Sequence, residues 1–294
     1  MFTKTISRHV IFGVCVIAIC FTLGCKRNAE NTYTDKIFDL PASNGRIVSV
    51  RVLTPNTCES CPLIIFSHGA NAAFDRYDNL ILPFAGAGYQ VAAPNHTDSE
   101  ENPNRADYTQ SDWLPTRLED YNVISAAFDT NFRVAAGHSF GALTAQIAGG
   151  TEVATGAKIN PVFSPKAVLA YSPPGPIPNY IDKKGWSKIG VPSLVTTGTT
   201  DIVPMMAEKW ELHLASFEAG PANKTFALIY NNMDHYMNGA YGRETETQSK
   251  ERDTAMKHMI DASIFFMSSI PKDGNIPSID WATQKRDYVD ARAK

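Results

Sequence analysis

Short apolar runs recur along the chain and alternate with segments of helical periodicity. Residues 46–53 alternate apolar and polar side chains, which predicts a strand exposed on one face. Residues 63–67 form a continuous apolar run, and residues 89–94 follow the same pattern, which is typical of strands buried on both faces. Further strands are predicted at residues 132–136, 167–171, 191–196 and 225–230.

The segments between these strands have helical periodicity. Residues 115–129, for example, gather their apolar side chains on one face. Helices are predicted at residues 75–87, 115–129, 140–148, 204–217 and 251–269. Strands separated by crossover helices predict a mostly parallel, doubly wound α/β sheet, flanked by helices, in a single domain. Functional residues on such a sheet lie at the carboxyl ends of its strands.

The first 24 residues have the pattern of an export signal. Lys4 and Arg8 precede a run of 14 residues without charge, residues 10–23, which is too short for a comfortable membrane span. Gly24 and Cys25 follow, and this order resembles a bacterial lipoprotein signal in which Cys25 is lipidated. A plain secretory signal and an N-terminal anchor helix are the alternatives.

This interpretation divides the chain into four parts. They are the signal peptide (1–24), a polar tether (25–35), the catalytic domain (36–270) and a C-terminal tail (271–294). The lipoprotein interpretation predicts a protein of the bacterial cell envelope, periplasmic or membrane-anchored, that contacts a membrane only through its lipid.

Composition and charge exclude two classes of protein. Hydrophobic residues make up 44% of the chain, which argues against general disorder. The net charge is -3 and the basic residues are scattered, so no nucleic-acid partner is predicted.

Two cysteines outside the signal segment form a CxxC motif, Cys58 and Cys61. A zinc site would need a second ligand pair, and none is evident; a thioredoxin-like site would begin a helix, whereas a predicted strand follows here. In an oxidising compartment the simplest interpretation is a local disulfide, with two free thiols as the alternative.

The motif with the strongest chemical meaning is the GHSFG sequence at residues 137–141, which follows a predicted buried strand and precedes a predicted helix. A GxSxG motif in that context is typical of a nucleophile elbow, in which a sharp turn exposes the serine hydroxyl. The glycines allow strand and helix to approach closely, and the helix N-terminus directs free N–H groups toward the serine. Ser139 is therefore the candidate nucleophile.

A His-Gly turn at His68 and Gly69 ends the earlier buried strand. Such a turn commonly supplies half of an oxyanion hole, so the main-chain N–H groups of Ala70 and Phe140 are predicted to converge on the oxyanion. His68 itself is interpreted as a structural residue, because it precedes the nucleophile.

The candidate acid and base follow the nucleophile in the order that this kind of triad requires. Asp201 ends a Gly-rich turn after the strand at 191–196, and His235 follows the strand at 225–230. Asp201 is predicted to orient His235. Asp182 and Asp234 are weaker candidates for the acid. The other histidines are expected to be surface or core residues: His96 precedes Ser139, and His213 and His258 fall in predicted helices.

Together, residues 66–69, 88–96 and 137–141 resemble the α/β-hydrolase superfamily, and within it the dienelactone-hydrolase-like and platelet-activating-factor-acetylhydrolase-like esterases. The resemblance implies a serine hydrolase that acts on small-molecule carboxylic esters without a metal or organic cofactor. The acetylhydrolase branch carries its acid one strand earlier, where this chain has no acid, so Asp201 is favoured.

Several functions stay open at this point. Besides an esterase, the chain is compatible with a peptidase, amidase or thioesterase, and with a non-catalytic binding protein on the same fold. Peptidase relatives tend to carry a propeller or a large cap domain, for which this chain has no room. Loop aromatics are expected around an open cleft: Tyr108, Trp113, Tyr171, Tyr180 and Trp186.

Overall fold

The computed structural model describes residues 32–128, 130–154, 163–204, 206–243, 249–271 and 279–294. The predicted signal segment at 1–24, Cys25 and the tether up to residue 31 lie outside this part of the chain. Within the described ranges, no helix has both the length and the apolar character needed to cross a membrane.

The described part of the domain is built on one sheet with the strand order β1-β2-β4-β3-β5-β6-β7-β8-β9. The strands from β4 to β8 are parallel, whereas β1, β2 and β9 pair antiparallel with their neighbours. The strands are β1 (Tyr33–Pro41), β2 (Ile47–Pro55), β3 (Leu63–Ser67), β4 (Gln90–Pro94), β5 (Arg133–His138), β6 (Ala167–Tyr171), β7 (Ser193–Gly198), β8 (Thr225–Tyr230) and β9 (Val289–Ala293).

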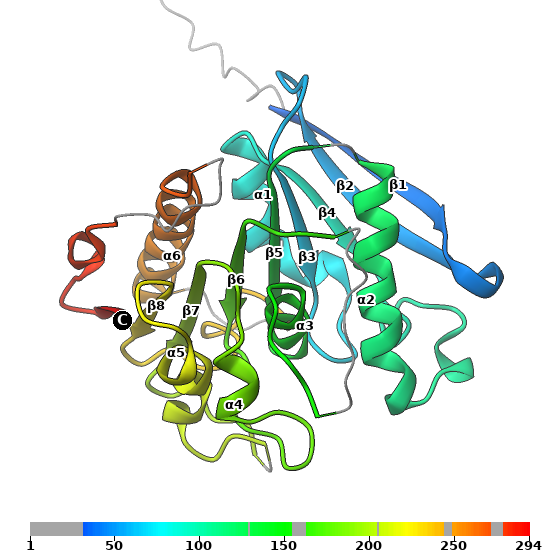
Figure 1. The fold of residues 1–294 in the computed structure, drawn as a ribbon. Coiled ribbons are helices and arrows are strands. Elements are labelled where there is room, and N and C mark those ends of the chain that lie inside the picture. The colour runs from blue at the N-terminus through cyan, green and yellow to red at the C-terminus, as the bar shows by residue number, and fades with distance from the viewer. Residues whose placement is uncertain (1–31, 129, 155–162, 205, 244–248, 272–278) are drawn as a thin grey trace, which may run out of the picture. The chain divides into compact units, whose positions relative to one another are not determined.

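Helices cover both faces of this sheet (Figure 1). The helices are α1 (Asp78–Gly86), α2 (Gln110–Ala127), α3 (Phe140–Ala148), α4 (Lys183–Trp186), α5 (Ala215–Ala219) and α6 (Lys250–Ser268). α1 and α6 pack on one face, and α2, α3 and α5 on the other. The inner strands contribute side chains to the hydrophobic cores on both faces of the sheet. In β3, Ile64 and Phe66 pack on the face covered by α1 and α6, and Leu63 and Ile65 pack on the face covered by α2, α3 and α5. The predicted α/β class is thus confirmed.

The sheet extends beyond the predicted domain boundaries at residues 36 and 270. β1 begins at Tyr33, within the predicted tether, and β9 lies in the predicted tail and pairs with β8. Both are edge strands with many exposed polar side chains, so neither has the apolar run that marks an inner strand.

Two predicted helices differ from the observed ones. The helix predicted at 204–217 is replaced by a Val203–Ala207 bridge, a 3₁₀ helix (Trp210–Leu214) and α5. α2 begins five residues earlier than predicted. Thr109 and Asp112 form a capping box, in which the Thr109 N–H donates to Asp112 Oδ2 at 2.8 Å.

The CxxC segment lies in the loop between β2 and β3. The structure joins Cys58 and Cys61 in a disulfide, with their Cα atoms 5.4 Å apart. The Thr130 hydroxyl donates to the Cys61 carbonyl at 2.8 Å, which fixes the loop against the end of α2.

Candidate active site

Ser139 occupies the sharp turn between β5 and α3. Its φ of 54° and ψ of -120° lie in a region that a non-glycine residue rarely adopts, so the backbone is strained there. The Ser139 N–H donates to the Tyr171 carbonyl at 2.9 Å, which ties the turn to β6. The strand–turn–helix arrangement expected from the sequence is present.

Gly137 and Gly141 are required by close backbone approach. A Cβ on Gly141 would overlap the carbonyl oxygens of Ser67 and His68, and a Cβ on Gly137 would overlap the Gly141 main chain. No side chain fits at either position without separating β3, β5 and α3. The two glycines of the motif therefore bring Ser139 beside the loop that follows β3.

Asp201 and His235 come from the loops after β7 and β8. Asp201 Oδ1 accepts a hydrogen bond from His235 Nδ1 at 2.8 Å, and Thr197 donates to Oδ2 at 2.8 Å. Burial by itself would raise the pKa of Asp201, but the neighbouring His213 and the hydrogen-bonded His235 hold it well below its ordinary value. Asp201 is therefore a carboxylate at neutral pH.

The rival acids have other partners. Asp234 Oδ1 accepts from the N–H groups of Tyr236 and Asn238, at 2.9 and 2.7 Å, and so closes the loop that carries His235. Asp182 caps α4 by accepting from the Gly185 N–H.

Ser139 and His235 line one cavity of about 840 Å³ at the carboxyl ends of the strands. Among the described residues, no hydrogen bond joins the Ser139 hydroxyl to His235. The wall of the cavity is largely apolar and includes Phe140, Pro174, Pro176, Ile177, Pro178, Val203 and Met206. Of the aromatic residues expected there, Trp113 and Tyr180 line it, whereas Tyr171 and Trp186 are core residues and Tyr108 is not among the lining residues.

Two main-chain N–H groups face the same cavity. Ala70 and Phe140 both line it, and neither N–H has a partner among the described residues. Phe140 is the first residue of α3, where the N–H has no acceptor within the helix. A Cβ on Gly69 would lie 3.6 Å from the Ser139 Cβ, so the loop passes directly beside the serine. The cavity thus combines a serine, a histidine and two free donors.

Comparisons with known proteins agree with the fold described above. A family model described as "Platelet-activating factor acetylhydrolase, isoform II" matches residues 28–117, which include the loop at Ala70 and end before Ser139. No curated protein matches the chain. Solved structures match over most of its length at low identity.

Three of these structures illustrate the range of relatives. A Klebsiella pneumoniae protein provisionally named a dienelactone hydrolase is 14% identical, with a TM-score of 0.60, over 81% of this chain and 99% of that one. Est1E from Butyrivibrio proteoclasticus, solved with ferulic acid, is 16% identical, with a TM-score of 0.57, over 79% and 99%. A puromycin-hydrolysing peptidase from Mycobacterium tuberculosis is 17% identical, with a TM-score of 0.57, over 82% of this chain but only 40% of its own length.

The chain has the α/β-hydrolase fold. The strand order and the position of the Ser139 turn between β5 and α3 agree with the resemblance inferred from the sequence.

Two structural features of this α/β-hydrolase site went unnoticed in the sequence, and the first is a hydrogen-bonded chain beneath Ser139. The Gly69 N–H donates to the Tyr77 hydroxyl at 2.9 Å, and that hydroxyl lies 2.9 Å from His138 Nδ1. His138 Nε2 lies 2.8 Å from the His235 carbonyl and must donate to it. Burial lowers the pKa of His138 well below its ordinary value, so this ring is neutral. The chain links three loops that surround the serine.

The second feature is a fully buried polar cluster behind the loop at Ala70. Arg117 donates to Asp98 through Nε at 2.9 Å and Nη2 at 2.7 Å, and to the carbonyls of His68 and Gly69 at 2.7 and 3.2 Å. Asp98 Oδ2 also accepts from the Asn71 N–H at 3.0 Å. These hydrogen bonds fix the main chain just before Ala70, at His68 and Gly69, and just after it, at Asn71.

The same cluster contains a second Ser–His–Asp arrangement. His96 Nε2 lies 2.7 Å from the Ser67 hydroxyl, and His96 Nδ1 lies 2.7 Å from Asp120 Oδ2. All three side chains are completely buried. The sequence signal was the presence of charged residues, Arg117 and Asp120, among the apolar positions of α2.

His213 is also part of the site, although the sequence placed it in a helix away from the chemistry. Its Nε2 lies 3.0 Å from Asp201 Oδ1, and the side chain is buried. Asp201, His213 and His235 each offer a ligand atom within 4.8 Å of the others, a spacing that could suit a metal ion. However, the 2.8 Å between Asp201 Oδ1 and His235 Nδ1 is a hydrogen-bond distance, shorter than expected between two ligands of one ion about 2 Å from each. The contact between Asp201 and His235 is therefore better described as a hydrogen bond than as shared metal ligation.

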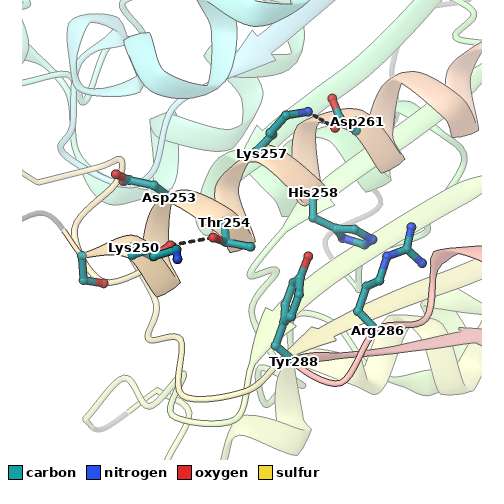
Figure 2. Close-up of a pocket in the computed structure, with 9 residues that line it drawn as sticks. Lys250, Asp253, Thr254, Lys257, His258, Asp261, Arg286 and Tyr288 are labelled. Atoms are coloured by element: carbon teal, nitrogen blue, oxygen red, sulfur yellow. Dashed lines mark hydrogen bonds and ion pairs between the residues drawn. The ribbon is translucent and has the colours of Figure 1, made fainter.

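A separate pocket lies between α6 and the segment that precedes β9, where Figure 2 shows His258, Arg286 and Tyr288 pointing toward one another. Neither Ser139 nor His235 lines it. His258 Nδ1 lies 2.9 Å from the Tyr230 hydroxyl, a core contact that agrees with its expected structural role.

Proposed function

We propose that this protein is a serine hydrolase that cleaves carboxylic esters through an acyl-enzyme. The observation that supports this most strongly is the meeting, at one cavity, of Ser139, the Asp201–His235 pair and two unpartnered main-chain donors. Acyl transfer needs a nucleophile, a base oriented by an acid, and donors that stabilise an oxyanion, and these groups can supply all three.

In the first half of the reaction His235 Nε2 removes the proton of the Ser139 hydroxyl as its oxygen attacks the ester carbonyl. The N–H groups of Ala70 and Phe140 stabilise the oxyanion of the tetrahedral intermediate. Asp201 holds the His235 tautomer that presents Nε2 to the serine and stabilises the imidazolium. When the intermediate collapses, His235 returns the proton to the leaving alcohol.

In the second half a water molecule attacks the acyl-enzyme. His235 takes the proton of the water, the oxyanion forms in the same place, and collapse releases the carboxylic acid as Ser139 regains its proton. No step requires a metal ion or an organic cofactor.

The relatives favour esters over the other acyl substrates. The Klebsiella and Butyrivibrio proteins are matched over 99% of their length, whereas the peptidase is matched over only 40%, so much of that protein has no counterpart here. The apolar lining of the cavity also suits an ester with an uncharged acyl group. A thioesterase or amidase activity on the same residues would be revealed by the assay below.

We further propose that the chain is exported to the bacterial cell envelope as a lipoprotein anchored through Cys25. The sequence pattern at residues 1–25 carries this proposal, and the Cys58–Cys61 disulfide is compatible with an oxidising compartment. Mass spectrometry of the mature N-terminus from the native host tests it. A chain beginning with lipid-modified Cys25 supports it, and an N-terminus at another residue contradicts it.

The test of the enzymatic proposal is hydrolysis of p-nitrophenyl esters of increasing acyl length, with amide and thioester analogues. We expect ester turnover that the Ser139→Ala variant loses by a factor of about 10⁴ or more. Ser67→Ala is the matched control, because Ser67 also lies next to a histidine but in the buried cluster. Retained turnover in Ser139→Ala would contradict the mechanism, and hydrolysis of amides or thioesters but not esters would contradict the substrate class.

A further inference from the structure

His213 has only acceptors around its two ring nitrogens. Nδ1 lies 2.7 Å from the Pro173 carbonyl oxygen, which can only accept, so Nδ1 carries a proton. Nε2 lies 3.0 Å from Asp201 Oδ1, the same carboxylate oxygen that accepts from His235; this is an ion-pair distance, although Nε2 is not aligned for a hydrogen bond. In a neutral ring with its proton on Nδ1, the Nε2 lone pair would lie within 3.0 Å of a carboxylate oxygen, which is unfavourable. The position of Nε2 therefore favours a second proton on the ring.

The electrostatics of the site agree with this count of protons. Burial by itself would lower the pKa of His213, but the nearby Asp201 carboxylate, with the Pro173 carbonyl, raises it above the ordinary value of 6.5. Asp201 remains ionised because its own pKa is held down by the two histidines.

We propose that His213 is an imidazolium at neutral pH that positions Asp201 and offsets its charge, and so sets the pH range in which His235 acts as the base. The catalytic part of this proposal rests on the proposed function, whereas the charge of His213 does not. His213 also fixes the 173–176 segment, in which Pro174 and Pro176 line the cavity.

The effect on His235 follows from the distance between the rings. Their centroids are 5.5 Å apart, so a cation on His213 disfavours a second cation on His235. The charged and titratable groups that face His213 are Asp201 and His235, with neutral His138 beyond His235. On its own 3₁₀ helix the charged neighbour is Glu211, which is exposed and screened.

The first measurement is an NMR titration of the full chain labelled with ¹⁵N-histidine, with the His213→Gln variant used to assign the signal. We expect both ring nitrogens of His213 to be protonated at neutral pH. A single proton on the ring at that pH would overturn the proposal. This readout needs no substrate, so it separates failure of this proposal from failure of the esterase assignment.

The second measurement is the pH dependence of kcat/KM for ester hydrolysis. Removing the cation in His213→Gln should move the acid limb of kcat/KM to higher pH by about one unit or more. Glu211→Gln, which removes an exposed charge from the same helix, should leave the limb in place. An equal loss of activity at every pH, with no shift, would mean that His213 is only structural.

Because His213 is buried, His213→Gln could fail to fold. His213→Asn then serves as the second neutral variant, and the proton count in the wild-type chain decides the charge independently of both.

Discussion

The Ser67–His96–Asp120 cluster and the Ser139–His235–Asp201 site both join a serine, a histidine and an aspartate, yet their surroundings differ. Ser67 lies in regular strand β3, is fully buried, and accepts a hydrogen bond from Arg117 at 2.9 Å. Ser139 lies at a strained turn, is partly exposed and faces a cavity with two unpartnered N–H groups. Residue types and distances alone therefore do not identify a nucleophile; access to substrate and free oxyanion donors do.

The two regions also differ in electrostatics. In the buried cluster, burial raises the pKa of Asp120 to about 6, although Arg46 opposes this, and burial lowers the pKa of His96 well below its ordinary value. Asp201 is instead held ionised between two histidines. We interpret the first region as a structural support for the loop at Ala70 and the second as the reacting centre.

The largest difference is expected when the two aspartates are compared. Asp201→Asn should lower kcat by about 10⁴, because His235 loses the partner that orients it, and should also lower the thermal midpoint, because Asp201 is a buried carboxylate with polar partners. Asp120→Asn should lower the thermal midpoint while kcat per folded molecule stays within about tenfold. Asp234→Asn is a further control with a mild expected effect on kcat. Ester kinetics and thermal unfolding of the three variants measure these effects. If kcat fell by several orders of magnitude in Asp234→Asn but only slightly in Asp201→Asn, Asp234 rather than Asp201 would be the acid.

The next effect concerns the ion pair that holds the loop at Ala70. Arg117→Met should lower the free energy of unfolding by about 3–5 kcal/mol, because Asp98 would remain buried without its partner. The double variant Arg117→Met/Asp98→Asn should be more stable than the sum of the single losses. Lys257→Ala, which removes an exposed pair with Asp261, should change stability by less than about 0.5 kcal/mol. Urea titration measures the free energy of unfolding of each variant. If the double variant lost as much as the two single variants together, Arg117 and Asp98 would not be coupled.

A smaller effect is expected from pH on stability. Asp98 is buried, which by itself would raise its pKa, but Arg117 holds it well below the ordinary value of 3.8, and the pKa of Asp201 is lowered as well. The stabilisation from both carboxylates is present above pH 3.8 and is lost as pH falls through their lowered values. Unfolding free energies should therefore decrease below about pH 4, by up to about 1.4 kcal/mol per pH unit for each group. Asp120, whose pKa is raised, has the opposite effect between about pH 6 and pH 4, so the range below about pH 3.5 is the informative one. A stability that does not decrease between about pH 3.5 and pH 2 would contradict the ionised pairs.

The smallest expected effect comes from the disulfide, whose cysteines belong to neither of the two Ser–His–Asp regions. Cys58 and Cys61 close a very short loop, so Cys58→Ser/Cys61→Ser should cost at most about 2 kcal/mol and leave kcat unchanged. Thermal unfolding with and without reductant measures this. A loss of activity on reduction would indicate an unforeseen link to the site.

The sequence predicted the parts of this molecule that have local signals. The inner strands have apolar runs, and the GHSFG turn, the Gly-rich turn before Asp201 and the position of His235 each follow a strand, so the fold class and the grouping of those residues could be anticipated. β1 and β9 could not, because edge strands have weak patterns. The Tyr77–His138 link, the Arg117–Asp98 pair and the contact of His213 with the Pro173 carbonyl join residues 61, 19 and 40 positions apart, and only the folded chain brings them together.

Active-site labelling tests the central claim most directly. The full chain is treated with a fluorophosphonate probe, and the modified peptide is located by mass spectrometry. Both Ser67 and Ser139 lie in Ser–His–Asp regions, but only Ser139 faces the cavity beside free oxyanion donors. We expect one stoichiometric label on Ser139, absent in Ser139→Ala and retained in Ser67→Ala. A label on Ser67, or no label on the folded protein, would contradict the assignment of Ser139 as the nucleophile.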